Sequence, residues 1–429
     1  MSVVNRMLDP VVPESVDDLK LADVEVLECP YPTYDLMLRE APVWKDPVTG
    51  MYIISRYEDC REIIRDPETF SNWRPTNDWD NLTGVARKAY LRFKEKGWVP
   101  GVSLAGRDDP NHKQMRAMFD EAFTASRIRE MDPAVEKLAY DLIDDWIDDG
   151  KCEFFWQFAV PLPLIIICQQ MGAPREDVWK IKEWTDAWMK GIGFGLTEEE
   201  LMWCIDKEIE SQHYFKPIFD RLRKKPDGTL LSELVNRVIP EWGRPLTDNE
   251  LMAEMMQDTF VGGSETTTNA ITSGLMLLGM NRPVWEQLKS DPDKYLRTFC
   301  EEVVRLESPA QGMSRLVKKD VEIQGVKIPA GSMLHMRYAA ANRDPAKFDC
   351  PHEIDLERKN AGAHLGFSSG VHHCLGAPLA RRELYWAFKA FTDRIEDFRL
   401  ADDNDLRHQP NFGLRIKTRL NIEFEKKKD

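Results

Sequence analysis

The 429-residue sequence lacks the features that direct a protein to a membrane or to an oxidising compartment. Residues 1–10 contain no apolar core of signal-peptide length. The most apolar run, residues 158–168, is interrupted by two prolines and is too short to span a bilayer. The eight cysteines show no paired spacing and no C-x-x-C, which argues against a disulfide framework. We therefore expect a cytoplasmic protein without a membrane anchor.

Basic residues are also scarce. The chain has 58 Lys and Arg against 73 Asp and Glu, a formal net charge of -15. Nucleic-acid binding usually needs a basic face, so this balance argues against it and against docking on an anionic membrane. Hydrophobic residues make up 42% of the chain, which is enough for a large core. Because no repeat or low-complexity tract is present, we expect a single large domain over residues 1–429, with an extended arm over residues 1–25.

The hydrophobic spacing predicts a mainly α-helical chain with small β-sheets. Helices are expected at residues 31–39, 57–65, 133–149, 175–188, 197–223, 230–238, 251–281 and 377–388. Two β-rich runs, 43–45 and 51–54, flank a Pro/Gly turn and predict a hairpin, and alternation over 321–328 predicts short strands. Residues 71–106 are broken by prolines and glycines, so they fit a functional loop or a surface excursion equally well.

Residues 367–376 carry a cysteine, Cys374, between Gly370 and Gly376. A helical run follows, with Pro378 near its start, where its missing N–H is tolerated. Unpaired N–H groups at a helix N-terminus favour a thiolate, which is a good axial ligand for haem iron. A lone cysteine is more often a small buried hydrophobe. The adjacent His-His pair also suggests zinc, although structural zinc ligands are separated by two or more residues.

Three other segments have unusual spacing. Gly262 and Gly263 interrupt the helix predicted at 251–281, at a cost of roughly 1 kcal/mol each relative to Ala. They indicate either a kink or close approach, or a poorly optimised helix. The other two segments each contain a pair of charged or titratable residues that share a helix face, being four or three positions apart. Taken alone, each pair fits an ordinary solvated pair on a helix surface. These pairs are His112 with Arg116 and Glu302 with Arg305.

Together these segments resemble the cytochrome P450 family over nearly the whole chain. The pattern F-x-x-G-x-H-x-C-x-G of residues 367–376 is similar to its haem-binding signature, with Ser368 where the family usually has glycine. Residues 262–267 resemble its oxygen-activation motif, (A/G)-G-x-(D/E)-T-(T/S). The H-x-x-x-R pair at 112–116 and the E-x-x-R pair at 302–305 resemble two further family motifs, in the same order and at the same separations.

The resemblance implies a single-domain P450 fold and a monooxygenase, an oxidoreductase that binds haem b (iron protoporphyrin IX). It would insert one oxygen atom from O2 into a C–H bond of an apolar small molecule (terpenoid, steroid, fatty acid or aromatic). Cys374 would bind the iron, and Glu265 with Thr266 would relay protons to dioxygen. Other haem contacts would be His112, Arg116, Arg315, His372, Phe367, Gly376 and Gly262.

The resemblance also assigns Glu302, Arg305 and Arg358 to a buried structural network. The candidate substrate pocket comprises Val261, Ala310, Gln311, Met313 and Phe412. Since no flavin or iron–sulfur domain is evident, electrons would come from a separate ferredoxin or flavodoxin-type protein, for which Lys113, Arg381 and Arg382 are candidate docking residues. Two rivals stay open: a peroxide-using or rearranging enzyme of the same fold, and a non-catalytic haem-binding protein.

Overall fold

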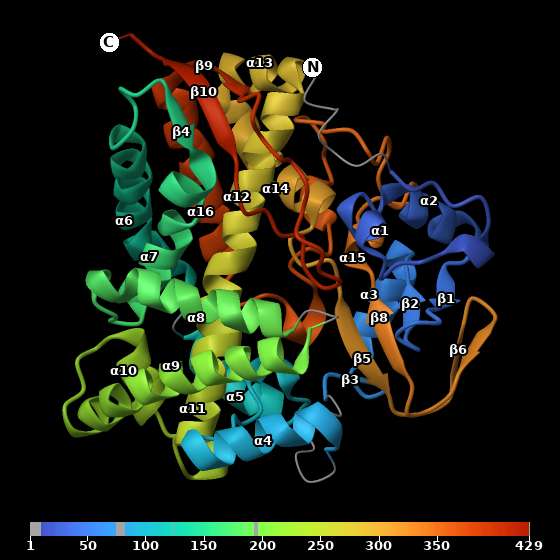
Figure 1. Cartoon of the computed structure of the whole chain (residues 1–429), viewed down its shortest axis with the longest axis vertical. Coiled ribbons are helices and arrows are strands. Elements are labelled where there is room, and N and C mark those ends of the chain that lie inside the picture. Colours follow the sequence, from blue (N-terminus) through green and yellow to red (C-terminus); the bar gives the residue numbers. More distant parts are fainter. Residues whose placement is uncertain (1–9, 74–81, 122, 193–195, 429) are drawn as a thin grey trace. The chain divides into compact units, whose positions relative to one another are not determined.

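The computed structural model describes residues 10–73, 82–121, 123–192 and 196–428. Two compact units make up the fold (Figure 1). The first comprises Met1–Ser71, Glu130–Leu162 and Thr266–Asp429, and it contains the β-sheets. The second comprises Asn72–Arg129 and Pro163–Glu265, and it is built from helices. The structure is thus mainly α-helical with small sheets, as the sequence predicts.

The largest sheet of the first unit has the strand order β1–β2–β8–β5–β3 (Figure 1). Its strands are β1 (Val43–Lys45), β2 (Tyr52–Ile54), β3 (Phe70–Ser71), β5 (Met313–Val317) and β8 (Met333–Met336). β1 and β2 form the predicted antiparallel hairpin, and β2 pairs in parallel with β8.

Two smaller sheets complete the β-structure of the first unit. The strands predicted at 321–328 form a two-stranded sheet, β6 (Val321–Ile323) with β7 (Val326–Ile328). The other sheet has the order β4–β10–β9 and comprises β4 (Lys151–Glu153), β9 (Ile395–Leu400) and β10 (Asn421–Lys426).

An apolar cluster joins the large sheet to helix α3 (Tyr57–Arg65). Tyr57, Cys60 and Ile64 recur at helical spacing, so one stripe of α3 is buried. Tyr338 and Leu365 belong to the same cluster. The chain that leads into the cysteine loop (residues 367–376) is therefore anchored in this core.

The helices confirm most of the predicted ones, with ends that differ by a few residues. Those of the first unit are α1 (Val24–Glu28), α2 (Tyr31–Glu40), α3, α13 (Arg282–Ser290), α14 (Pro292–Glu307), α15 (Tyr338–Ala341) and α16 (Ala377–Arg394). Those of the second are α4 (Gly84–Lys96), α5 (Asn111–Asp120), α8 (Val178–Gly191), α9 (Glu198–Lys224), α10 (Leu230–Asn236) and α11 (Asp248–Ala253). Three helices continue from one unit into the other: α6 (Ala125–Asp144), α7 (Pro161–Gln170) and α12 (Gly262–Met280).

The helix expected at 251–281 is divided. A π-helical stretch, Glu254–Val261, separates α11 from α12, and α12 begins at the first of the two glycines. π-helical turns are rare and recur at functional sites. The glycines therefore mark a change from π-helical to α-helical geometry.

Two segments for which the sequence predicts no regular structure, residues 71–106 and the N-terminal arm, contain ordered parts. The stretch 71–106 contains α4, although residues 74–81 lie outside the described part. Within the expected arm, residues 1–9 lie outside the described part, and Leu19 and Leu21 are buried in an apolar cluster with Tyr34. No helix of the described residues is both long and apolar enough to cross a membrane.

A cluster of buried charges in the first unit joins segments that are far apart in the sequence. It comprises Glu28, Glu307, His408 and Arg415, and we refer to it as the charge cluster. Arg415 Nε lies 2.9 Å from Glu307 Oε2, and the His408 backbone N–H donates to Glu28 Oε2 at 2.6 Å. Burial and the charges of Arg415 and Lys417 outweigh the two carboxylates, and they lower the pKa of His408 to about 4 from 6.5.

This pKa predicts acid-sensitive stability. His408 stays neutral in the folded protein down to about pH 4, whereas in the unfolded chain it takes up a proton near pH 6.5. The free energy of unfolding should therefore fall as the pH falls between these values. A His408→Gln variant should lack this pH-dependent fall in the free energy of unfolding, which amounts to about 3 kcal/mol. Urea unfolding across that pH range measures it, and equal pH dependence in both proteins would contradict the assignment.

Candidate functional site

Cys374 lies in a closed loop between a 3-10 turn, Gly370–His372, and the start of α16. Its backbone N–H donates to the carbonyl oxygen of Phe367 at 2.9 Å, and the His373 N–H donates to that of Gly370 at 3.1 Å. Cys374 is exposed. The buried cysteines, by contrast, are Cys60, Cys152, Cys168, Cys204 and Cys300. The loop therefore presents one accessible thiol on a backbone that its own hydrogen bonds hold closed.

A carboxylate from α14 holds both ends of this loop. Glu301 accepts hydrogen bonds from Arg381 Nε (2.6 Å) and Nη2 (3.1 Å), and it lies 3.0 Å from His364 Nε2. The Arg381 guanidinium lies over the Phe367 ring, 4.5 Å from its centre. Although burial opposes ionisation, the bonds from His364 and Arg381 lower the pKa of Glu301 to about 2. We refer to these four residues as the loop clamp.

The donor set of the loop fits haem and does not fit zinc. Among the described residues, no group of three His, Cys, Asp or Glu side chains could hold a metal ion. A single thiolate can bind iron only if a macrocycle supplies the other ligands, as in haem. Beside the loop, the buried Ser369 Oγ has no hydrogen-bond partner in the described structure, and a Cβ added at Gly376 would meet nothing within 4 Å. The unpartnered hydroxyl at Ser369 and the open space at Gly376 would suit a large group placed against the loop.

The predicted propionate contacts lie on separate elements. In the first unit, Arg315 is a buried residue of β5 whose Nη1 donates to the Ser314 carbonyl at 2.8 Å, and His372 is half-buried in the 3-10 turn. In the second unit, both remaining residues lie on α5. His112 is buried, and its Nδ1 lies 3.3 Å from Asp109 Oδ1. Arg116 Nε lies 2.7 Å from Asp120 Oδ1.

Helix α12 presents different faces at Glu265 and Thr266. Gly262 is exposed and Thr266 half-buried, whereas Ser264, Glu265 and Thr267 are buried. Positions four apart share a helix face, so Gly262 and Thr266 lie on one stripe that is less buried than Ser264, Glu265 and Thr267. We refer to it as the open stripe. Gly262 and the half-buried Thr266 thus lie on the same side of the helix.

Glu265 faces a buried lysine that the sequence analysis missed. Lys182 Nζ lies 3.0 Å from Glu265 Oε1, and the Thr185 hydroxyl donates to the same oxygen at 2.9 Å. Lys182 also contacts Asp186. Burial opposes the charge, but Glu265 and Asp186 raise the pKa of Lys182 above its usual value. A signal was available in the sequence: Lys182 stands between Ile181 and Trp184 on the apolar side of an amphipathic helix.

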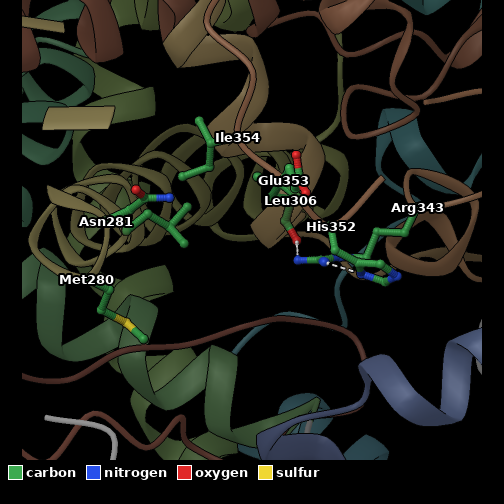
Figure 2. Close-up of a pocket in the computed structure, with 8 residues that line it drawn as sticks. Met280, Asn281, Leu306, Arg343, His352, Glu353 and Ile354 are labelled. Carbon is green, nitrogen blue, oxygen red and sulfur yellow. Dashed lines mark hydrogen bonds between the residues drawn. The ribbon is translucent and has the colours of Figure 1, made fainter. Parts of the chain in front are cut away.

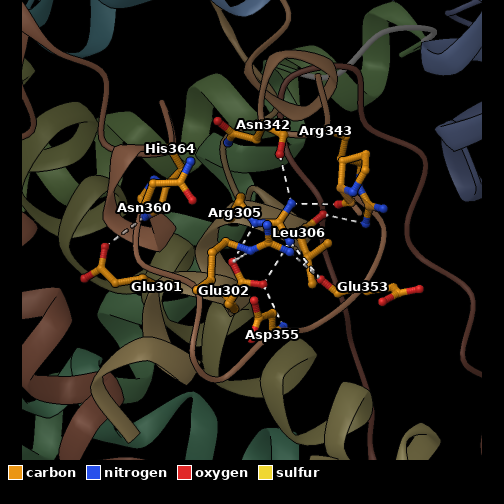
Figure 3. Close-up of polar contacts among 12 residues, drawn as sticks. Glu301, Glu302, Arg305, Leu306, Asn342, Arg343, Glu353, Asp355, Asn360 and His364 are labelled. Atoms are coloured by element: carbon orange, nitrogen blue, oxygen red, sulfur yellow. Dashed lines mark hydrogen bonds and ion pairs between the residues drawn. The ribbon is translucent and has the colours of Figure 1, made fainter. Parts of the chain in front are cut away.

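Glu302, Arg305 and Arg358 come together in the first unit. Figure 3 shows Glu302 and Arg305 with their polar contacts. Arg305 Nε and Nη2 donate to the two Glu302 oxygens at 2.6 and 2.9 Å. Arg305 also donates to the carbonyl oxygens of Asn342, Pro351 and Glu353. Arg358 Nε lies 3.1 Å from Glu302 Oε1. The side chains of Glu302 and Arg305 are fully buried, so the segment at 349–358 is held by a dry ion pair.

Two of the predicted pocket walls lie side by side in the first unit. Ala310 pairs with Leu414, and the Gln311 backbone N–H donates to the Gly413 carbonyl at 2.8 Å. Phe412 is buried against the His335 ring, and Met313 is exposed on β5.

The other two pocket candidates have different surroundings, since the side chain of Gln311 is bonded to the framework and Val261 belongs to the second unit. The Gln311 side chain is bound into the framework, since its amide contacts Tyr34, Glu307 and Ser308. Val261 is buried in the second unit, at the end of the π-helical stretch.

A separate cavity of about 460 Å³ lies elsewhere in the first unit (Figure 2). It is lined by Leu277, Met280, Asn281, Leu306, Arg343, His352, Glu353 and Ile354. Arg343 and His352 are hydrogen-bonded across it at 2.9 Å. None of the predicted pocket residues lines this cavity.

Comparison with known proteins identifies the family. A family model described as Cytochrome P450 matches residues 205–420, half of the chain. The polyketide biosynthesis cytochrome P450 PksS of Bacillus subtilis is 32% identical over 380 residues, which cover 87% of this chain and 89% of that protein. This chain belongs to the cytochrome P450 family. It is accordingly a P450 monooxygenase, and the cofactor of the family is haem b.

Other P450s match over similar lengths. The vitamin D(3) 25-hydroxylase of Pseudonocardia autotrophica is 30% identical over 86% of this chain and 87% of its own. P450BioI, solved with a fatty-acid-ligated acyl carrier protein, is 27% identical with a TM-score of 0.82, over 94% of this chain and 99% of that one. CYP109E1 of Bacillus megaterium, solved with testosterone, is 26% identical with a TM-score of 0.80 over the same shares. The predicted single-domain P450 fold is confirmed.

One structural match has a different organisation. An intact type IV self-sufficient P450 monooxygenase is 26% identical with a TM-score of 0.86, and the match covers 96% of this chain but 55% of that one.

The buried pair of Arg305 predicts a large stability loss on truncation. An Arg305→Ala change would leave the Glu302 carboxylate uncompensated and three carbonyl oxygens without their donor. The free energy of unfolding should fall by about 3–5 kcal/mol. Arg282→Ala is a matched control, because Arg282 pairs with Asp397 at the surface, and it should cost at most about 1 kcal/mol. Equal losses in the two variants, measured by urea unfolding, would contradict this role.

Proposed function

We propose that this P450 inserts one oxygen atom of O2 into a C–H bond of an apolar small molecule, with Cys374 as the ligand of the haem iron. The observation that carries the proposal is the exposed thiol of Cys374, held in a closed loop by the loop clamp. Bound there, haem supplies the O2 activation and the C–H oxidation, while the protein supplies the ligand, the pocket and the protons.

Thr266 and Glu265 are the proposed proton relay. Thr266 lies on the open stripe of α12, where its hydroxyl can pass a proton. Glu265 is the adjacent acid, and its carboxylate lies 3.0 Å from the buried Lys182 ammonium. The relay residues favour O2 as the oxidant over peroxide, because peroxide brings its own protons.

The proposed propionate partners are Arg315, His372, His112 and Arg116. Cationic and N–H donors hold carboxylates well. Phe367 and Gly376 flank the ligand within the cysteine loop, and Gly262 leaves room on the open stripe of α12. Glu302, Arg305 and Arg358 are proposed to act on the framework only, since all three residues are buried and bind one another and the backbone of residues 342–353.

The proposed substrate is an apolar molecule of steroid size. Ala310, Met313, Phe412 and Val261 would supply apolar contacts, and such pockets bind mainly through hydrophobic surface. Gln311 would fix the wall through its backbone and its buried amide. Two relatives support this class, since one is named a vitamin D(3) 25-hydroxylase and CYP109E1 was solved with testosterone.

The proposed electron donor is a separate ferredoxin or flavodoxin-type protein. Arg381 and Arg382 are engaged in ion pairs with Glu301 and Asp132, at 2.6 and 2.5 Å. Their charge is therefore partly neutralised, which leaves less positive potential for an acidic partner than their sequence position suggests.

The cysteine assignment predicts a specific spectroscopic loss. The reduced, CO-bound protein should show the red-shifted Soret band of thiolate ligation, and Cys374→Ala should abolish it. Cys350→Ala is the matched control, because Cys350 is also exposed but lies outside the cysteine loop, and it should keep the band. In the wild type, testosterone or vitamin D3 should shift the ferric Soret band toward high spin, and product should appear with electron donor and O2. A band that survives in Cys374→Ala, or no shift and no product with an apolar panel, would reject the proposal.

The proton relay predicts a change in pH dependence. In Lys182→Met, the Glu265 carboxylate loses its buried cationic partner, so the pH profile of O2-dependent turnover should move to higher pH. Lys180→Met, on the exposed side of the same helix, should leave the profile unchanged. Thr266→Ala should lower the product formed per O2 consumed. Full coupling in Thr266→Ala, or equal profiles for the two lysine variants, would remove these residues from the relay.

A further inference from the structure

One residue of the cysteine loop adopts a backbone conformation that suits glycine. Ser368 has φ of +55°, in the left-handed region, and it stands where the haem-binding signature of the family usually has glycine. A side chain in this region costs roughly 1–2 kcal/mol, because its Cβ approaches the following carbonyl oxygen. A strained residue beside a functional group persists only where its surroundings hold it.

The surroundings of Ser368 provide such a contact. The hydroxyls of Tyr338 and Ser368 lie 3.1 Å apart, within hydrogen-bond distance. Tyr338 begins α15 and is 1% exposed, in the apolar cluster that also contains Leu365. Without Ser368, the Tyr338 hydroxyl would lose the partner that this structure gives it in a dry environment, which is costly. A glycine at 368 could not make this bond.

The position of Ser368 in the loop connects this bond to the thiol. Phe367, directly before Ser368, supplies the carbonyl oxygen that accepts the Cys374 backbone N–H at 2.9 Å. The Ser368 N–H in turn donates to the Leu365 carbonyl at 2.8 Å. The backbone angles at Ser368 therefore set the direction of the carbonyl that holds Cys374.

We propose that the hydrogen bond between Tyr338 and Ser368 holds the cysteine loop in its closed form, and that these two are positioning residues for the Cys374 thiolate. A buried tyrosine hydroxyl thus maintains a left-handed backbone at a position where the family signature usually has glycine. The inference rests on the proposed role of Cys374 as the iron ligand, and it adds the contact that keeps that ligand in place.

The test uses the holoenzyme and three variants: Tyr338→Phe, Ser368→Ala and the double variant. Each single change removes the same bond, so each should speed the decay of the red-shifted Soret band of the reduced CO complex, by roughly threefold to tenfold. The double variant should decay no faster than the single ones, because they share one interaction. Amide hydrogen exchange over residues 367–374 should rise in parallel.

Two further variants separate this role from general stability. Tyr57→Phe is the matched control, since the Tyr57 hydroxyl donates to the Ala363 carbonyl at 2.6 Å in the same apolar cluster. It should lower the unfolding temperature without changing the band decay or the loop exchange. Ser368→Gly removes the bond but also the backbone strain, so it should decay more slowly than Ser368→Ala.

The outcomes distinguish this inference from the function itself. Band decay and exchange equal to those of Tyr57→Phe, or additive effects in the double variant, would overturn the inference alone. A wild-type protein without the red-shifted band would overturn the Cys374 ligand and this inference with it.

Discussion

The structure of the first unit depends on a guanidinium that solvent does not reach. Arg305 is fully buried, and its charge is balanced by Glu302 on the same helix and by three carbonyl oxygens from other segments. An uncompensated charge in a dry interior is very unfavourable. The segments that carry these acceptors must therefore pack around Arg305 together. The segment at 349–358 is therefore fixed by a cooperative contact, although it has little regular secondary structure of its own.

Helix α14 uses neighbouring residues for two purposes. Glu302 binds Arg305 and Arg358, while Glu301, one position earlier, points to His364 and Arg381 at the ends of the cysteine loop. Successive residues of a helix differ in direction by about 100°, so one helix can hold both segments at once. The position of the Cys374 thiol thus follows from the packing of α14. The short E-x-x-R pattern has a physical basis in this arrangement and needs no part in the chemistry.

The same helical geometry gives Glu265 and Thr266 different surroundings on α12. Thr266 is a half-buried residue of the open stripe, and the carboxylate of Glu265 is buried against Lys182 and Thr185. A charged acid can stay in the interior only with such a partner. In the cysteine loop, the Tyr338 hydroxyl satisfies a related requirement, since it stabilises a serine in a conformation that favours glycine. In both places a polar contact from another element stabilises a residue that would be unfavourable on its own, a buried acid at Glu265 and a left-handed serine at Ser368.

The sequence by itself determined the family, the helical class and most local elements. Hydrophobic spacing was sufficient to predict α3 and the β1–β2 hairpin, because the hydrogen bonds of each element join residues that are close in the sequence. The motif spacing was sufficient to select Cys374, Glu265 and Thr266 as candidates. Only the tertiary structure brought Lys182 to Glu265 and Glu28 to His408, residues that lie 83 and 380 positions apart. It alone showed the π-helical stretch before α12 and the left-handed backbone at Ser368. Those contacts depend on where distant elements pack, and no periodicity within a short segment encodes that.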